Sequence, residues 1–264
     1  MIHSLPLTSK PALPRRDKIR ASRKGGEALA TYEILITDVT RYSNLYCVAG
    51  WDVHAQRMIR PEPPGANMAY EPSKFWDGRY AGQGRVFAVG NVARIDANPP
   101  PAQFPFPHAT EDRIVGDVTT IKVLRVLDSP GTVAAVAAGV SPTLEAAFDN
   151  ALVRPLSGKA YVLAGRKSRS LGAVDIGPNQ LQLFQNTYDP KKPKLRARIE
   201  ISGKLYDLPV TADAARTRWQ QSGSAALQGD VQASARLHVR VGLSRPFAAM
   251  PTQCFVQING IYFL

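Results

Sequence analysis

The stretch that decides the fold is TYEILITDVTRYSNLYCVAGWDVHAQRMIR, residues 31–60. It contains three runs rich in apolar, β-branched and aromatic residues, at 32–39, 45–52 and 57–60, which short polar segments separate. Runs of this length between turn-forming residues predict β-strands. Because the separating segments are so short, we expect the three strands to form an antiparallel meander.

Outward from the meander, the first half predicts two further strands. Prolines and a glycine at 61–65 are expected to stop the third strand, and a long aromatic loop follows. We expect the fourth strand at 85–95 and the fifth at 114–127. The segment between them has five prolines between 98 and 107, which cannot donate hydrogen bonds to a β-ladder, so we expect no strand there. Five strands in about 100 residues, with an irregular excursion after the third, indicate an OB-type barrel.

Helical texture at 129–153 separates this barrel from the second half. A helix with its cap at Ser141 and Pro142 in its first turn fits the pattern, and we interpret it as a packing connector. β texture then returns, interrupted by a short helix expected at 212–220. The strands expected here are 160–163, 180–184, 194–201, 205–210, 235–243 and 254–263.

These patterns predict a mainly β protein made of two OB-like small barrels packed together with a helical connector. The expected parts are a basic flexible arm at 1–30, a first barrel at 31–128, a connector at 129–157 and a second barrel at 158–264. Six cations between residues 15 and 24 make the arm basic. Such an arm either lies along phosphates or is a solvated tail, including one created by a wrongly chosen start codon.

The charge balance favours polyanionic partners. The chain has 33 Lys and Arg against 21 Asp and Glu, a formal net charge of +12. Nucleic acid is the first partner class that this excess indicates and an anionic membrane the second, although ordinary solubility charge is an alternative. No run approaches the roughly 20 apolar residues that span a bilayer, and no signal peptide is recognised. We therefore expect a cytoplasmic protein without membrane contact.

Motifs for enzyme chemistry are incomplete in this sequence. Cys47 and Cys254 stand alone without zinc-site or redox spacing, so both are expected to be buried thiols. The four histidines do not cluster, and no glycine-rich phosphate loop or nucleophile elbow is complete. We therefore predict no enzyme, no metal and no cofactor, although scattered carboxylates are free to meet in space.

Candidate binding residues come first from two strands in which cations alternate with apolar residues. One is 194–199 and the other 236–241. Alternate residues of a strand share a face about 6.6 Å apart, close to the phosphate spacing of an extended nucleic acid strand. A half-exposed strand without a ligand shows the same pattern, so both readings stay open.

Loop aromatics beside cations supply a second set of candidates, because bases stack on flat rings. Trp76 and Tyr80 are the preferred platforms, whereas Trp51 is expected in the core. Arg60 and Arg245 each precede a proline, which suits either phosphate binding or a buried ion pair that joins the barrels. The complete set of candidates is Arg41, Tyr42, Arg60, Trp76, Arg79, Tyr80, Lys192, Lys194, Arg196, Arg198, Arg236, Arg240 and Arg245.

Five short motifs follow one another in a suggestive order. They are CVAG at 47–50, MIRP at 58–61, YDLPVT at 206–211, RVGLSRPF at 240–247 and NGIYF at 259–263. In this order the chain resembles the bacterial dual OB-containing domain family over about residues 31–264. The resemblance implies two OB folds and a nucleic-acid-related role in bacterial defence or mobile-element systems. Ala212, where the resemblance leads us to expect Asp, and the alanine-rich connector depart from the pattern.

Three hypotheses about function follow. The leading one is binding of single-stranded or structured RNA or DNA, within a larger complex that includes protein partners. The alternative is a protein-interaction subunit with no direct nucleic-acid contact, because OB barrels also serve as docking modules. The third is a nuclease or nucleotide-processing enzyme whose carboxylates meet only in the folded chain.

Overall fold

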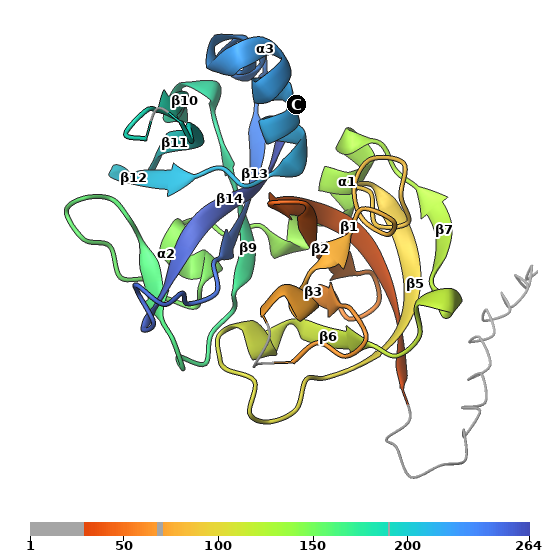
Figure 1. Ribbon diagram of the computed structural model, residues 1–264. Coiled ribbons are helices and arrows are strands. Elements are labelled where there is room, and N and C mark those ends of the chain that lie inside the picture. The colour runs from red at the N-terminus through yellow and green to blue at the C-terminus, as the bar shows by residue number, and fades with distance from the viewer. Residues whose placement is uncertain (1–28, 68–70, 190) are drawn as a thin grey trace, which may run out of the picture.

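The computed structural model describes residues 29–67, 71–189 and 191–264, which form two β-rich halves lying side by side (Figure 1). The basic arm expected at 1–30 lies outside the described residues except for its last two. Of the helices within the described ranges, none has both the length and the apolar character needed to cross a membrane.

The first half is a barrel that closes on itself. β1 (Ala30–Tyr42), β2 (Leu45–Asp52) and β3 (Arg57–Glu62) form the expected antiparallel meander. β5 (Asn91–Asn98) pairs with β1, and β6 (Asp112–Val115) pairs antiparallel with β5 and parallel with β3. The ring of pairings β1–β2–β3–β6–β5–β1 is therefore complete, which confirms the prediction of a five-stranded barrel.

Two strands of this barrel differ from the prediction. The fourth strand begins at Asn91 instead of 85, after Gly90, whose φ of 90° turns the chain. The region expected as one strand at 114–127 is divided into β6 and β7 (Lys122–Val126). Between them Asp117 caps the 3₁₀ turn η3 (Val118–Thr120) by accepting a hydrogen bond from the amide of Thr119 at 2.8 Å. The long loop after β3 carries η1 (Glu71–Lys74) and the two-residue strand β4 (Trp76–Asp77), which pairs with β2.

The connector is helical, but in short pieces. α1 (Ser129–Ala135) is capped by Asp128, η4 (Ala137–Gly139) follows, and α2 (Leu144–Ala147) is capped by Thr143 instead of Ser141. Leu144, Ala147 and Phe148 are fully buried in the core of the second half. The connector therefore completes the second barrel and is more than a spacer.

The second half repeats the connectivity of the first. Its strands are β8 (Tyr161–Leu163), β9 (Leu171–Ile176), β10 (Leu181–Asn186), β11 (Lys194–Ile201), β12 (Lys204–Pro209), β13 (Leu237–Leu243) and β14 (Gln253–Phe263). β10, β11 and β12 form a meander, while β8, β14, β13 and β9 form a second sheet. A parallel bridge from Val210, just after β12, to Ile258 of β14 links the two sheets, as β3 and β6 do in the first barrel.

β9 was not expected from the sequence, yet it is needed to complete the barrel. It pairs with β13, and the turn η5 (Pro178–Gln180) leads directly into β10, which pairs with β11. β9 and β10 together therefore occupy the position that the single long strand β1 holds in the first barrel.

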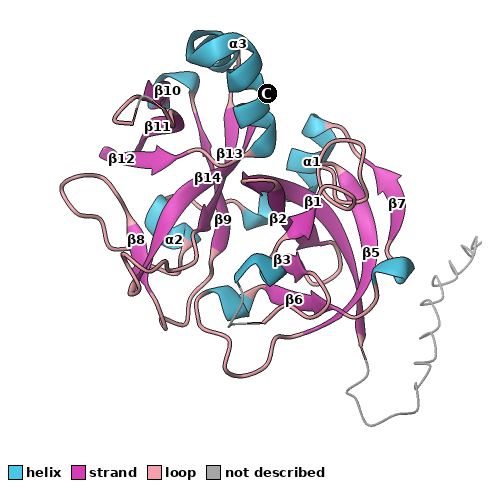
Figure 2. Ribbon diagram, viewed as in Figure 1, coloured by secondary structure: helices cyan, strands magenta, loops and turns pink. Residues whose placement is uncertain are grey.

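α3 (Asp213–Gln232) covers one end of the second barrel and is longer than the helix expected at 212–220 (Figure 2). It kinks at Gly223, whose φ is 80°, and then continues to Gln232 with buried residues on one side. Trp219, Leu227 and Val231 pack into the second core. The serines and glycines beyond 220 hid this second part from the sequence pattern.

A third apolar cluster joins the two barrels. Leu35, Trp51 and Met58 of the first barrel pack with Val136 of the connector and Leu171 of β9. This explains why the middle of β1 is buried on both faces. It also confirms the expectation that Trp51 belongs to a core.

Candidate functional site

A cavity of about 530 Å³ opens between the two barrels, and we call it the junction pocket. This volume lies in the range of small-ligand sites. The first barrel contributes the end of β1, the adjoining faces of β2 and β3, and η2 (His108–Thr110). The second contributes the start of β11, the β13–β14 loop and β14. The lining residues are Asp38, Thr40, Arg41, Tyr42, Cys47, Ala49, Arg60, Phe75, His108, Leu171, Lys194, Thr211, Leu243, Ser244, Arg245, Phe247, Gln257 and Asn259.

Exposed aromatic rings stand at this pocket. Tyr42, at the β1–β2 turn, is 60% exposed and stacks on Phe75 with ring centroids 5.4 Å apart and planes 18° apart. Phe247, in the β13–β14 loop, is 48% exposed. Each barrel therefore offers a flat ring with a solvent-facing side, the geometry on which a base stacks.

Cations dominate the charge of the lining. Lys194 is exposed and has no ion pair within the described residues. Arg41 lies 3.3 Å from Asp213 and donates to the Oε1 atom of Gln220 at 2.9 Å. Asp38, the one acid in the lining, is bound by Arg240 behind it. Lys194 is therefore the lining cation that has no acidic partner within the described residues.

The floor of the pocket is a buried network that ties the barrels together. Arg60 of β3 donates to Asp112 at 2.7 Å and to the Oγ atom of Ser170, in the second half, at 2.9 Å. Arg245 of the second half donates through Nη2 to Glu62 and, at 3.0 Å, to Asp112. Arg245 therefore forms a buried ion pair between the barrels, whereas the ion pair of Arg60 lies within the first barrel and only its hydrogen bond to Ser170 crosses the junction.

Burial shifts the protonation of this network. It raises the pKa of Glu62 to about 7, with the nearby Asp112 adding to the effect, and it also raises the pKa of Glu111 to about 7. Although burial opposes its ionisation, Asp112 keeps a lowered pKa because Arg245 and Arg60 stabilise its charge. Asp112 is therefore the ionised partner of both arginines. Glu62 and Glu111 each change protonation state near neutral pH.

Polar atoms without a partner collect in the same place. Burial holds the pKa of His108 well below its usual value, so the ring is neutral and donates through Nε2 to the carbonyl of Leu243 at 3.1 Å. Among the described residues its Nδ1 atom has no hydrogen-bond partner, and neither have the Oε2 atom of Glu62 and the Nη1 atom of Arg245. Buried polar atoms are nearly always satisfied, so this group marks a place for water or a ligand.

Some of the residues predicted from the sequence meet in the junction pocket. They are Arg41, Tyr42, Arg60, Lys194 and Arg245. Cys254 is buried as expected, and burial raises its pKa to about 11, but Cys47 is only half-buried and lines the pocket.

The expectation for Trp76 is wrong. Its ring is 2% exposed, its Nε1 atom donates to the carbonyl of Pro61 at 2.8 Å, and it packs against Phe87 in the first core. Tyr80, the other preferred platform, is half-buried against Trp76. Arg79 remains exposed and pairs with Asp77. The long loop thus folds Trp76 into the first core and half-covers Tyr80.

The cationic face expected on β13 is also wrong for Arg240. β13 lies between β9 and β14, and the face of the strand that carries Arg240 packs against the first barrel. Arg240 is therefore only 1% exposed. Its Nε atom lies 3.1 Å from Asp38. Arg236, before the strand, is exposed but lies 3.5 Å from Asp175.

On β11 the expected alternation is confirmed. Leu195, Ala197 and Ile199 are buried, while the cations point outward. Arg196 pairs with Asp207 at 2.6 Å, and Arg198 lies over the ring of Phe184 at 5.0 Å. Of the exposed cations here, Lys194 reaches the junction pocket, whereas Lys192 and Arg198 do not line it.

The sequence interpretation missed several lining residues, among them Phe75, His108, Phe247, Gln257 and Asn259. Phe75 and Phe247 carry a usable signal, since each is a large aromatic in a predicted loop. His108, Gln257 and Asn259 carry none, because only the packing of one barrel on the other brings them together.

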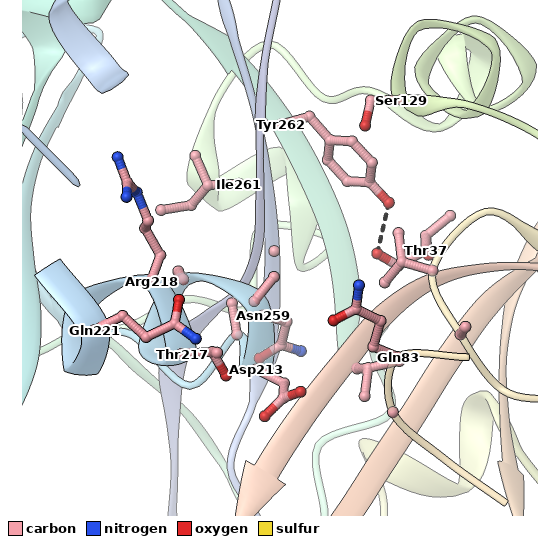
Figure 3. Close-up of a pocket in the computed structure, with 18 residues that line it drawn as sticks. Thr37, Gln83, Ser129, Asp213, Thr217, Arg218, Gln221, Asn259, Ile261 and Tyr262 are labelled. Carbon is pink, nitrogen blue, oxygen red and sulfur yellow. Dashed lines mark hydrogen bonds between the residues drawn. The ribbon is translucent and has the colours of Figure 1, made fainter. Parts of the chain in front are cut away.

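A second cavity of about 400 Å³ lies between the start of α3 and the first barrel (Figure 3). Tyr262 borders it and donates to the carbonyl of Thr37 at 2.8 Å, while Gln83 faces it from the first barrel. Arg218, its one lining cation, is paired with Asp230 at 3.0 Å. This cavity offers neither an exposed ring nor an unpaired cation among its lining residues, so the junction pocket is the better candidate.

Groups that could hold a metal were also sought. Within the part of the chain that the structure describes, no three or more His, Cys, Asp or Glu side chains are arranged as a metal site.

The comparisons with known proteins give one result. A sequence model of the family described as dual OB-containing domain matches residues 32–261. Comparison with curated proteins and with solved structures finds no significant match. The family match spans both barrels and therefore both sides of the junction pocket.

Proposed function

Since the chain belongs to the dual OB-containing domain family, we propose that it binds single-stranded nucleic acid, RNA or DNA, in the junction pocket. The observation that carries the proposal is the set of exposed rings, Tyr42 and Phe247, lining the same cavity as the unpaired cation Lys194. OB folds bind oligonucleotides and oligosaccharides through the face of strands 2 and 3 and through the loops that join strands 1–2 and 4–5. Here the β1–β2 turn of one barrel and the β13–β14 loop of the other meet at one pocket.

Charge favours nucleic acid over a sugar. Four cations and one acid line the pocket; Arg41, Arg60 and Arg245 are each paired with an acid, Lys194 has no ion pair among the described residues, and the whole chain carries a net charge of +12. A neutral oligosaccharide gains nothing from this excess, whereas phosphates release counterions when they meet Lys and Arg. Lys194 and Arg41 would contact phosphates, and Tyr42 and Phe247 would each stack a base.

The rings also select single strands. A base can stack on Tyr42 or Phe247 only when it is no longer stacked on the adjacent base. In a duplex this unstacking requires local melting. Because every base has a flat face, sequence preference should be modest.

In this proposal the chain binds without cleaving and serves within a larger bacterial complex, such as a defence or mobile-element system. The setting rests on the family resemblance alone. Incubation of the protein with a labelled oligonucleotide and a divalent metal distinguishes simple binding from the nuclease hypothesis. Cleavage that is lost in a variant with a substituted carboxylate would contradict simple binding.

The salt dependence of oligonucleotide binding tests the proposed function. Lys194 and Arg198 are exposed on the same face of β11, but only Lys194 lines the pocket. We expect Lys194→Gln to weaken binding roughly two- to fivefold and to reduce the slope of log K against log salt by about 0.7. Arg198→Gln is the matched control and should leave both quantities unchanged. Binding that ignores salt, or equal effects of the two variants, would contradict binding at this pocket.

One observation favours protein docking as a second candidate function. All five residues of β7 are exposed, and β7 is the last strand of its sheet, with pairing to β5 on one side. An exposed edge strand with Val123, Leu124 and Val126 is a template for strand addition. Lys122 and Arg125 on the same strand favour an extended partner with acidic side chains.

Synthetic extended peptides that alternate acidic and apolar residues test this second function. We expect such peptides to bind the wild type and to lose binding in Leu124→Pro, which disrupts the edge, while oligonucleotide binding stays unchanged. Absence of peptide binding to the wild type would remove protein docking at β7.

A further inference from the structure

The hydrogen bonding of Arg245 is incomplete, because its acidic partners use only one of its two terminal nitrogen atoms. It lines the junction pocket, and its Nη2 atom donates to Glu62 and Asp112. Its Nη1 atom is buried and has no partner within the described residues. A guanidinium presents donors as a fork that matches two oxygens of a phosphate, so Arg245 has half of such a fork available.

Glu62, the acid that Arg245 would have to release, also has incomplete hydrogen bonding. Glu62 binds Arg245 from outside the pocket lining, its side chain is fully buried, and its Oε2 atom has no hydrogen-bond partner in the part of the chain that the structure describes. Asp112, by contrast, is held by Arg60 at 2.7 Å as well as by Arg245. Glu62 is therefore the more easily exchanged of the two acids.

We propose that Arg245 binds a terminal phosphate of the nucleic acid by exchanging Glu62 for it, and that Glu62 takes up a proton from solvent as it is released. The inference rests on the proposed function and names the part of the ligand that reaches the floor of the same pocket. A phosphate at a chain end can descend to Arg245 with one nucleotide, whereas an internal phosphate would have to draw the chain down on both sides.

The proton balance follows from the groups that face Glu62. Arg60 from β3, Asp112 from β6, Arg245 from the β13–β14 loop and Lys74 from η1 all act on it. Burial and Asp112 raise its pKa to about 7 while Arg245 still stabilises its charge. Once a phosphate occupies Arg245, Glu62 loses that stabilisation and gains another negative neighbour, so its pKa rises further and it binds a proton. No other bond changes.

Isothermal titration calorimetry tests the exchange with a ten-nucleotide single strand that carries a 5′-phosphate, a 3′-phosphate or neither. Titrations in two phosphate-free buffers of different ionisation enthalpy at pH 7.5 report the protons taken up on binding. We expect one phosphorylated form to bind at least about tenfold more tightly than the unphosphorylated strand, the effect of one charge-assisted contact. We also expect uptake of a substantial fraction of one proton.

Variants separate the two residues. Glu62→Gln should retain the preference for the phosphorylated end and lose proton uptake, whereas Glu200→Gln, which changes an exposed carboxylate on β11, should behave as the wild type. Arg245→Lys, checked for folding by thermal unfolding, should lose the preference because an ammonium lacks the fork.

The outcomes are distinct. Equal affinities for all three strands, or a preference without proton uptake in the wild type, would overturn the exchange and leave the proposed function standing. Absence of binding for all three strands would overturn both.

Discussion

At the scale of single residues, the barrel junction decides which cations face a ligand. The sequence pattern places Arg240 on an exposed cationic strand face and leaves Arg60 open between phosphate binding and a buried ion pair. In the structure both are buried in ion pairs, with Asp112 at 2.7 Å and with Asp38 at 3.1 Å. Strand alternation shows which residues share a face, but it does not show whether that face meets solvent or another barrel.

Tyr42→Ala is the residue-scale prediction for binding. The ring is 60% exposed, so its removal should cost little stability. The loss of one stacked base should weaken oligonucleotide binding by about 1 to 3 kcal/mol, or roughly five- to 150-fold. Fluorescence anisotropy with a labelled strand measures it. Tyr188→Ala is the control, since Tyr188 is more exposed still and does not line the pocket; a comparable loss there would count against stacking at Tyr42.

At the scale of elements, local signals predicted most strands and missed β9, whose pairing partner is distant in sequence. β2 and β11 occupy the predicted ranges because their alternation and turns are local. β9 was missed because Leu171–Ile176 is short and its pairing with β13 is distant in sequence. Of the candidate site, the rim residues on β1 and β11 were predictable, whereas His108 and Asn259 meet only through the packing of one barrel on the other.

α3 offers an element-scale prediction with opposite signs at two glycines. Gly223 has a φ of 80° and a ψ of 170°, a region that only glycine adopts readily, so Gly223→Ala should destabilise the protein by about 1 to 3 kcal/mol. Gly229 lies in the same helix without a positive φ and with open space around it, so Gly229→Ala should stabilise by about 0.5 to 1 kcal/mol. Urea unfolding measures both. A Gly223→Ala variant as stable as the wild type would show that the kink does not require glycine.

At the scale of the whole molecule, the two barrels lie side by side (Figure 1). Buried polar contacts across the junction hold them in one arrangement. Arg240→Met leaves Asp38 buried without its partner and should cost about 3 to 5 kcal/mol. Arg218→Met breaks the exposed pair with Asp230 and should cost less than about 1 kcal/mol. Chemical denaturation measures both variants, and a loss below about 1 kcal/mol for Arg240→Met would mean that the buried pair does not secure the junction.

The same junction makes stability depend on pH. Because the folded-state pKa of Glu111 is raised to about 7 by burial, the native state holds a proton that the unfolded chain releases above about 4.5. Its contribution to the free energy of unfolding is therefore lost as pH rises from about 4.5 to 7, by on the order of 3 kcal/mol.

Comparison of Glu111→Gln with the wild type isolates this contribution. The buried histidines His108 and His238 have lowered pKa values and act in the opposite direction, so the difference between the two proteins is the quantity to measure. We expect the stability of the wild type relative to the variant to fall between pH 4.5 and 7 and to stay level above it. A difference that does not change with pH would show that Glu111 titrates normally.

The measurement that tests binding at the junction pocket most directly is ultraviolet crosslinking of a short single strand, with the modified residues identified by mass spectrometry. We expect adducts on Tyr42, Phe75 or Phe247, the aromatic residues that line the pocket. Adducts confined to aromatics outside it, such as Tyr188 and Phe184, would contradict binding between the barrels.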